Sequence, residues 1–251
     1  MLPEEQELAR LESELANLED QVVTAEETLE TLKVETAQFQ HHYYQIVGWL
    51  FAELDRLVAQ IARVAAGLEP ENTEAQTQAE AAEQQAQKSA EEAGLAEKQP
   101  PPPEITPELK QAFRQAAKLM HPNRATTDAE RKRRTTIMAM VNVAYEKGDK
   151  ATIEKLIIEF GHDPEAITGE DVSARLVKTI RRIAQLRRRL NEAQQEIAAQ
   201  TANELYELRL TITEAKEMGG DPLGDLERQL MQQISEKKIE LEMIRQQRVS
   251  G

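Results

Sequence analysis

Residues 8–32 have the sequence LARLESELANLEDQVVTAEETLETL, and the spacing of their apolar side chains decides the fold class. These side chains recur at alternating steps of three and four residues, as Leu8, Leu11, Leu15, Leu18, Val22, Ala25, Leu29 and Leu32. Such a heptad repeat is typical of a left-handed coiled coil, because it keeps one apolar seam on a single helix face. The repeat continues to Leu50 and takes one extra four-residue step there. We therefore predict a rod over residues 1–68 that contains a stutter near Leu50.

A lone helix of this kind exposes its seam to water and needs a partner. Another copy of the chain, the C-terminal helices or a different protein would each serve. Just before the stutter, the scarce aromatic residues widen the apolar face, and we take four side chains as candidates for docking another helix or protein: Tyr43, Ile46, Trp49 and Phe51. The alternative is that they pack within the chain at the stutter.

Composition restricts the function classes. The 251 residues include no cysteine, which excludes disulfides and thiolate chemistry and fits a cytoplasmic location. No phosphate-binding loop, Ser-His-Asp set or metal-ligand spacing occurs, so we expect neither an enzyme nor a bound metal or cofactor. No apolar run is long enough for a transmembrane helix and no signal peptide is apparent. The net charge of −14 argues against non-specific nucleic-acid binding.

Proline and glycine residues divide the remaining chain into segments. Residues 69–104 are rich in Glu, Gln and Ala and end in Pro100–Pro103, which predicts a linker that is partly helical or disordered and then extended. Residues 163–251 predict a helical hairpin or coiled coil. Its first long helix starts near Gly169, and its second starts at the break Gly219–Pro222.

Between these segments, residues 105–162 predict a small helical module. A first helix starts at Thr106 with proline at its first position and ends near Met120. A second helix is expected from about 128 to 147, and a third from about 151 to 160. The sequence His121–Asn123 breaks the chain between the first two helices.

In the first of these helices, Lys110, Arg114 and Lys118 recur every four residues on a face opposite the apolar one, and His121-Pro122-Asn123 follows. The second helix closes with Val-Asn-Val-Ala-Tyr-Glu. Together these features, over about residues 105–160, resemble helix II, the His-Pro-Asp loop and helix III of the J domain of DnaJ-type co-chaperones. The resemblance implies that these six basic-face and loop residues contact a DnaK-type chaperone.

Two departures from the J-domain pattern change what the resemblance implies. Asn123 stands where the family has an aspartate that is essential for stimulating ATP hydrolysis, so stimulation is expected to be weakened. Helix I of the family is not apparent before Pro107. Another helix, from the rod or from the tail, would have to cover the face left open.

The leading hypothesis is therefore an all-α co-chaperone or scaffold, with long coiled-coil helices flanking a J-domain-like module. It would contact a DnaK-type chaperone and a coiled-coil partner or second copy. The alternative is a non-chaperone scaffold in which the J-like module only packs. The basic clusters Arg131–Arg134 and Arg187–Arg189 open a third alternative, an adaptor at nucleic acid or a membrane surface. Because stacking aromatics are nearly absent there, nucleic acid is not expected and membrane contact is at most peripheral.

Overall fold

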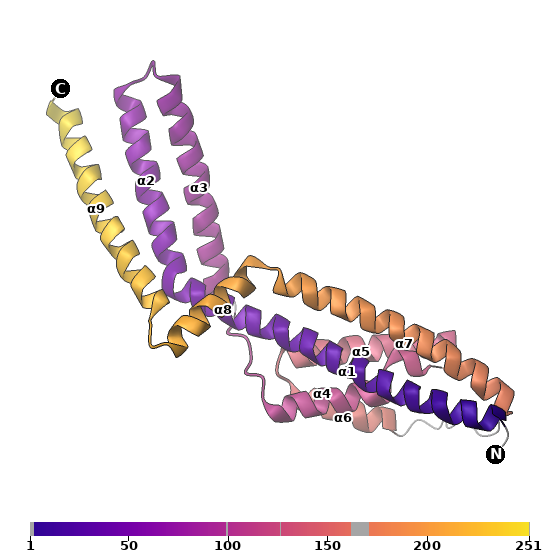
Figure 1. Ribbon diagram of the computed structural model, residues 1–251. Coiled ribbons are helices and arrows are strands. Elements are labelled where there is room, and N and C mark those ends of the chain that lie inside the picture. The colour runs from indigo at the N-terminus through magenta and orange to yellow at the C-terminus, as the bar shows by residue number, and fades with distance from the viewer. Residues whose placement is uncertain (1–2, 99, 126, 162–170, 251) are drawn as a thin grey trace. The chain divides into compact units, whose positions relative to one another are not determined.

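The computed structural model describes residues 3–98, 100–125, 127–161 and 171–250 (Figure 1). Its helices are α1 (Pro3–Tyr43), the π-helical turn η1 (Tyr44–Gly48), α2 (Trp49–Leu68), α3 (Thr73–Lys98), α4 (Pro107–Met120), the 3-10 turn η2 (Pro122–Arg124), α5 (Asp128–Glu146), α6 (Lys150–Gly161), α7 (Val172–Thr201), α8 (Glu204–Glu217) and α9 (Pro222–Ser250). No strand occurs in the described ranges, and the predicted all-α fold class is confirmed.

The chain forms two compact units, each assembled from segments that are distant in the sequence. Unit 1 contains Met1–Thr36 with Pro102–Tyr206, and unit 2 contains Ala37–Pro101 with Glu207–Gly251. The sequential division into rod, linker, module and C-terminal hairpin therefore differs from the observed grouping. The two helices expected to pair as a hairpin fall into different units, because α7 and α9 each pack on the N-terminal segment of their own unit. The predicted start of the first, near Gly169, lies outside the described residues.

In unit 1, α1 and α7 run in the same direction and pair along the heptad seam. Their apolar contact is formed by Leu11, Leu15, Leu18, Val22, Ile183 and Leu186. Three ion pairs flank it, Glu12–Arg175 at 2.5 Å, Glu19–Arg182 at 2.5 Å and Glu26–Arg189 at 2.8 Å. Each joins residues 163 apart, and successive pairs are one heptad apart. This register is the one a parallel coiled coil predicts, although supercoiling itself stays a prediction. On α7, Thr179 is buried, whereas the neighbouring Ile180 is 48% exposed.

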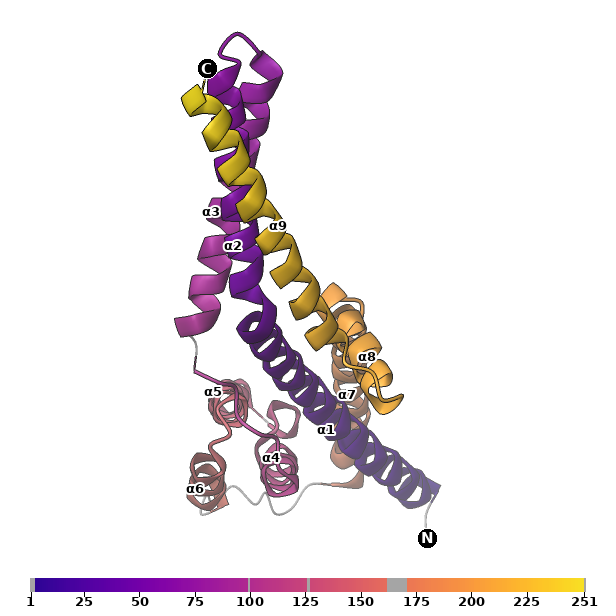
Figure 2. The ribbon, with the colours of Figure 1, turned by 90° about the vertical axis from the view of Figure 1, so that its left-hand side faces the viewer.

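The small helical module of unit 1 consists of α4, α5 and α6, which Figure 2 views nearly along their axes. Thr106 caps α4 by accepting a hydrogen bond from the Leu109 amide, and Thr127 caps α5 in the same way. Phe113 and Tyr145 form the centre of the core, fully buried and with ring centroids 4.9 Å apart. The three helices match their predicted bounds within a few residues, because caps, Pro and Gly mark each end.

Helix α1 packs against the module formed by α4, α5 and α6. Val23 of α1 belongs to the apolar core of the module. The Thr31 hydroxyl forms a buried hydrogen bond of 2.7 Å with the Tyr145 hydroxyl. The expectation that a helix of the rod or the tail would cover one face of the module is therefore met by the rod.

In unit 2, α2 packs against both α3 and α9 (Figure 1). The segment predicted as a linker, partly helical or disordered, is largely helix α3, which lies along α2. Its small side chains permit close packing, and Ala79 and Ser89 are buried. Ser89 and Gln85 also hydrogen-bond to Asp55 of α2. The linker was expected because large apolar side chains are scarce there, but alanine and serine suffice when two helices lie close together.

The predicted stutter coincides with η1. A π-helical turn carries one extra residue, which rotates the apolar face just before the four-residue step at Leu50. Gly48 permits this turn, because a Cβ atom there would lie 2.8 Å from Cδ1 of Tyr44. Beyond the turn, Leu50 and Leu57 pack against Leu230 and Leu241 of α9.

Candidate partner-binding face

The cationic face of α4 is opposite the apolar face that builds the module core. Two of its three cations form ion pairs with α1 in the structure. Arg114 pairs with Glu27, and the Lys118 ammonium lies 2.7 Å from a carboxylate oxygen of Asp20. Lys110 has no ion-pair partner among the residues that the structure describes. The face predicted to bind a partner is thus largely engaged by the chain's own acidic helix.

The loop after α4 is shaped by His121. Its Nδ1 accepts a hydrogen bond of 3.2 Å from the Asn123 amide, and Pro122 opens the 3-10 turn that follows. Since Nδ1 is an acceptor, the ring proton lies on Nε2, which donates to Glu26 of α1 at 3.1 Å. His121 is only 7% exposed. The histidine of the predicted contact site therefore lies inside unit 1.

Glu26 is the point at which α1, α7 and the loop meet. One of its carboxylate oxygens accepts from His121 and, at 2.8 Å, from Arg189 of α7. Burial alone would raise the pKa of Glu26, but the hydrogen bonds from His121 and Arg189, together with the charge of Arg189, outweigh it and hold the pKa below the ordinary value. The ionised carboxylate is therefore the stable form at this junction.

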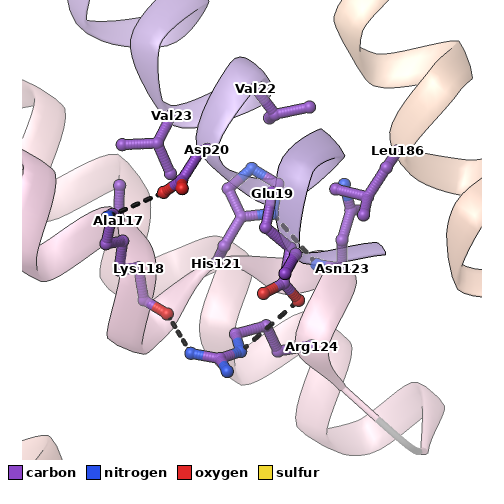
Figure 3. Close-up of a pocket in the computed structure, with 11 residues that line it drawn as sticks. Glu19, Asp20, Val22, Val23, Ala117, Lys118, His121, Asn123, Arg124 and Leu186 are labelled. Carbon is purple, nitrogen blue, oxygen red and sulfur yellow. Dashed lines mark hydrogen bonds and ion pairs between the residues drawn. The ribbon is translucent and has the colours of Figure 1, made fainter. Parts of the chain in front are cut away.

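Asn123 lines a cavity of about 240 Å³ between α1, α4 and α7 (Figure 3). The carboxylates of Glu19 and Asp20 also line it, on the α1 side. The Asn123 Nδ2 atom is buried without a hydrogen-bond partner. Arg124, next in the loop, has its guanidinium 3.8 Å from Glu19 and bonds to the Lys118 carbonyl. An aspartate at position 123 would place a third carboxylate in this cavity, whereas asparagine adds no charge.

The sequence reading missed the second buried face of α1. With the seam at heptad positions a and d, Glu27 and Val34 occupy f, and Val23 and Glu30 occupy b, positions that normally face water. All four are at most 5% exposed. The signal that could have revealed this face was the pair of β-branched apolar residues, Val23 and Val34, off the seam. Its acidic members gave no such signal, because glutamate is common on exposed helix faces.

The aromatic docking candidates lie in unit 2, and most of them pack within it. Tyr43, Ile46 and Phe51 contact the apolar cluster that joins α2 to α9. Trp49 is 52% exposed and borders a groove of about 1150 Å³ between α2, α3 and α9. Packing at the stutter, the alternative reading, thus describes three of the four residues.

The arginine clusters pair with acids or stack within the chain. Arg182, Arg187 and Arg189 of α7 all pair with glutamates of α1. The guanidinium groups of Arg133 and Arg134 lie 5.6 and 4.8 Å from the centroid of the Phe160 ring. These contacts within the chain favour internal pairing of the bases over an adaptor at nucleic acid or a membrane.

Within the described ranges, no three acidic or histidine side chains gather as a metal site would require. Nor is any helix there both long and apolar enough to cross a membrane. Comparisons with protein-family models, with curated proteins and with solved structures find no match to this chain.

Proposed function

We propose that this protein is a J-domain-like co-chaperone or scaffold, and that the cationic face of α4 and the His121–Asn123 loop bind acidic protein surfaces. A DnaK-type chaperone is the partner that the J-like sequence implies. The observation that carries the proposal is the docking of this face on the acidic residues of α1, through Arg114 and Lys118. A face that holds one acidic helix has the chemistry to hold another.

The strength of these contacts suits exchange between partners. The Lys118–Asp20 pair joins two side chains that are 57% and 64% exposed, so water screens it, and exposed pairs of this kind contribute about 0.2–1 kcal/mol. The Arg114 side chain is 55% exposed, whereas the carboxylate of its partner, Glu27, is buried. ATPase stimulation is proposed to be weak, because Asn123 cannot accept the charge-assisted hydrogen bonds that an aspartate accepts.

A second candidate is the non-chaperone scaffold in which the J-like module only packs. It is favoured by the burial of His121 and by the junction at Glu26, which ties the loop to α1 and α7. In both candidates the function is binding rather than catalysis, and the cytoplasm is the proposed location. A coiled-coil partner or a second copy of the chain remains part of the proposal.

Lys110 allows a direct test, because its reversal breaks no ion pair with α1 among the described residues. Binding of the full-length protein to an ATP-loaded DnaK-type chaperone is measured for wild type, Lys110→Glu and Lys132→Glu. Lys132 is an exposed lysine of α5, outside the face, and serves as the control of equal charge. We expect Lys110→Glu alone to lose affinity, by tenfold or more.

Single-turnover ATP hydrolysis with wild type, Asn123→Asp and His121→Gln then separates binding from stimulation. Stimulation by wild type that disappears in His121→Gln would establish a working co-chaperone. Stimulation only in Asn123→Asp would show that the contact persists and the trigger is lost. Absence of binding and of stimulation for every variant would leave the scaffold candidate.

A further inference from the structure

Helix α1 carries two acidic dipeptides one heptad apart, Glu19-Asp20 and Glu26-Glu27. Within each dipeptide the two carboxylates have different partners. Glu19 and Glu26 pair with α7 and with the residues that follow α4. Asp20 and Glu27 pair with cations of α4 itself. The repeat therefore matches α1 to two neighbours at once, with one carboxylate of each dipeptide directed to each side.

We propose that residues 19–27 of α1 are the resident ligand of the α4 face, and that an external partner binds there only by displacing them. The partner that fits is an acidic helix whose carboxylates recur every seven residues. The identity of that partner as a chaperone surface rests on the proposed function, whereas the masking by α1 does not.

The order of the ion pairs defines how an acidic helix lies on this face. Along α1, Asp20 precedes Glu27, whereas their partners follow the opposite order, from Lys118 to Arg114. The two helices are therefore antiparallel, with seven residues of α1 for each four residues of α4. Extending this series by one step, we infer that position 34 of α1 aligns with Lys110.

Position 34 is occupied by valine, which leaves Lys110 without an acidic partner on α1. A competing helix with a carboxylate at that third position gains one ion pair that α1 lacks. This difference gives the partner an advantage over the resident helix, and it makes Lys110 the place where exchange starts.

The neutral side chain of Asn123 belongs to the same arrangement. It lies in the cavity lined by Glu19 and Asp20, and its Nδ2 atom is buried there without a hydrogen-bond partner. An aspartate there would repel both carboxylates of α1 across a short distance. Asn123→Asp therefore weakens the masking by α1, in the same direction as removal of acidic residues from α1.

The test uses the full-length chain and a fluorescent peptide of residues 13–37 as the probe. Asp20→Lys combined with Glu27→Lys unmasks the face, and Glu4→Lys combined with Glu7→Lys is the control with the same change of charge on the same helix. We expect the peptide to bind the unmasked variant at least tenfold more tightly than wild type, with the control within about twofold of wild type. Equal affinity of the unmasked variant and wild type would overturn the proposal.

A peptide with Val34→Glu tests the spacing. It should bind the unmasked variant about threefold more tightly than the unchanged peptide, a gain in the range of one exposed ion pair. Addition of Lys110→Glu to the protein should remove that gain. A gain that survives Lys110→Glu would contradict the alignment of position 34 with Lys110.

A covalent lock excludes unfolding as the cause of unmasking. Because the chain has no cysteine, Asp20→Cys with Lys118→Cys can be joined selectively by a short bismaleimide. The linked protein should reject the peptide, and the same protein before linking should bind it. Peptide binding that is unchanged by the link would refute masking.

The same samples are tested against an ATP-loaded DnaK-type chaperone, which separates the two proposals. Peptide binding without chaperone binding would support masking and refute the chaperone function. Chaperone binding that is equally strong with and without the link would support the chaperone function and refute masking.

Discussion

Glu26→Gln and Glu30→Gln are expected to change the free energy of unfolding in opposite directions at neutral pH. The two glutamates lie one turn apart on α1, and their side chains are 12% and 5% exposed. The pKa of Glu26 is lowered, because His121 and Arg189 outweigh the effect of burial. The pKa of Glu30 is raised by burial, which its single ion pair, with Lys33 at 2.9 Å, does not offset.

For Glu26, the glutamine variant keeps an oxygen acceptor but loses its charge. Hydrogen bonds to charged groups contribute about 1.5–3 kcal/mol, and neutral ones about 0.5–1.5 kcal/mol. With two donors, the expected loss is about 2 kcal/mol. Arg189 keeps an acidic partner in this variant, because a carboxylate oxygen of Glu196 lies 3.1 Å from its guanidinium group. Since the folded pKa is depressed, this stability is present above the ordinary glutamate pKa of about 4.3 and is lost as the pH falls through the folded value.

For Glu30→Gln, the expected change in the free energy of unfolding has the opposite sign. Its folded pKa is raised, so the stability associated with its neutral form is present at low pH and is lost as the pH rises through the folded value. At about pH 7 the wild type therefore buries a poorly compensated charge, and one carboxylate oxygen has no hydrogen-bond partner. Glu30→Gln removes that charge and gives up an ion pair with Lys33 worth at most about 1 kcal/mol, so we expect it to stabilise by up to about 1 kcal/mol.

The assay is urea unfolding followed by circular dichroism, with hydrogen exchange at α4 as a local readout, from about pH 7 to about pH 3. On acidification, the advantage of Glu30→Gln should vanish first, and the deficit of Glu26→Gln should vanish last. Shifts of the same sign at about pH 7, or a deficit of Glu26→Gln that grows at low pH, would refute the assignment of His121 and Arg189 as the stabilising partners.

Three further perturbations test the packing. Phe113→Ala should destabilise unit 1 by about 3–5 kcal/mol in urea unfolding, because its ring is fully buried in the module. Gly148 has φ +68° and its added Cβ would lie 2.6 Å from Pro103, so Gly148→Ala should lower the melting temperature, whereas Gly94→Ala, with open space around it, should raise it. The single tryptophan, Trp49, should be accessible to acrylamide in dilute solution, and protection that appears with rising protein concentration would show that a second copy covers the groove.

The elements that the sequence predicts well are those whose ends are marked locally. Thr106 with Pro107 begins α4, and Gly148 follows the end of α5, so the module helices appear where expected. The heptad seam is equally readable, because apolar residues, mostly leucines, recur at alternating steps of three and four residues. Each of these signals acts within one or two turns of helix and does not depend on what the rest of the chain does.

The pairing of helices could not be predicted in the same way. An apolar seam can pack against another copy of the chain, against α7 or against α9 with similar apolar contacts. Only the long-range register of charges distinguishes these packing partners. That register is present in the sequence as glutamates and arginines 163 residues apart, a separation that no local signal marks. The packing of α3 along α2 could not be predicted for a different reason, since alanine and serine at buried positions look identical to alanine and serine in a solvated linker.

The candidate site shows why the charge of a residue has to be interpreted together with its neighbours. Considered alone, Asn123 lacks the carboxylate that the J-domain pattern has at this position, and His121 only marks a loop. Next to Glu19 and Asp20, the amide is the side chain that allows the loop to approach an acidic helix. Next to Glu26, His121 supplies the donor that keeps a buried carboxylate ionised. The same substitution that weakens one contact therefore strengthens another, and the balance between the two decides whether α1 or an external partner holds the α4 face.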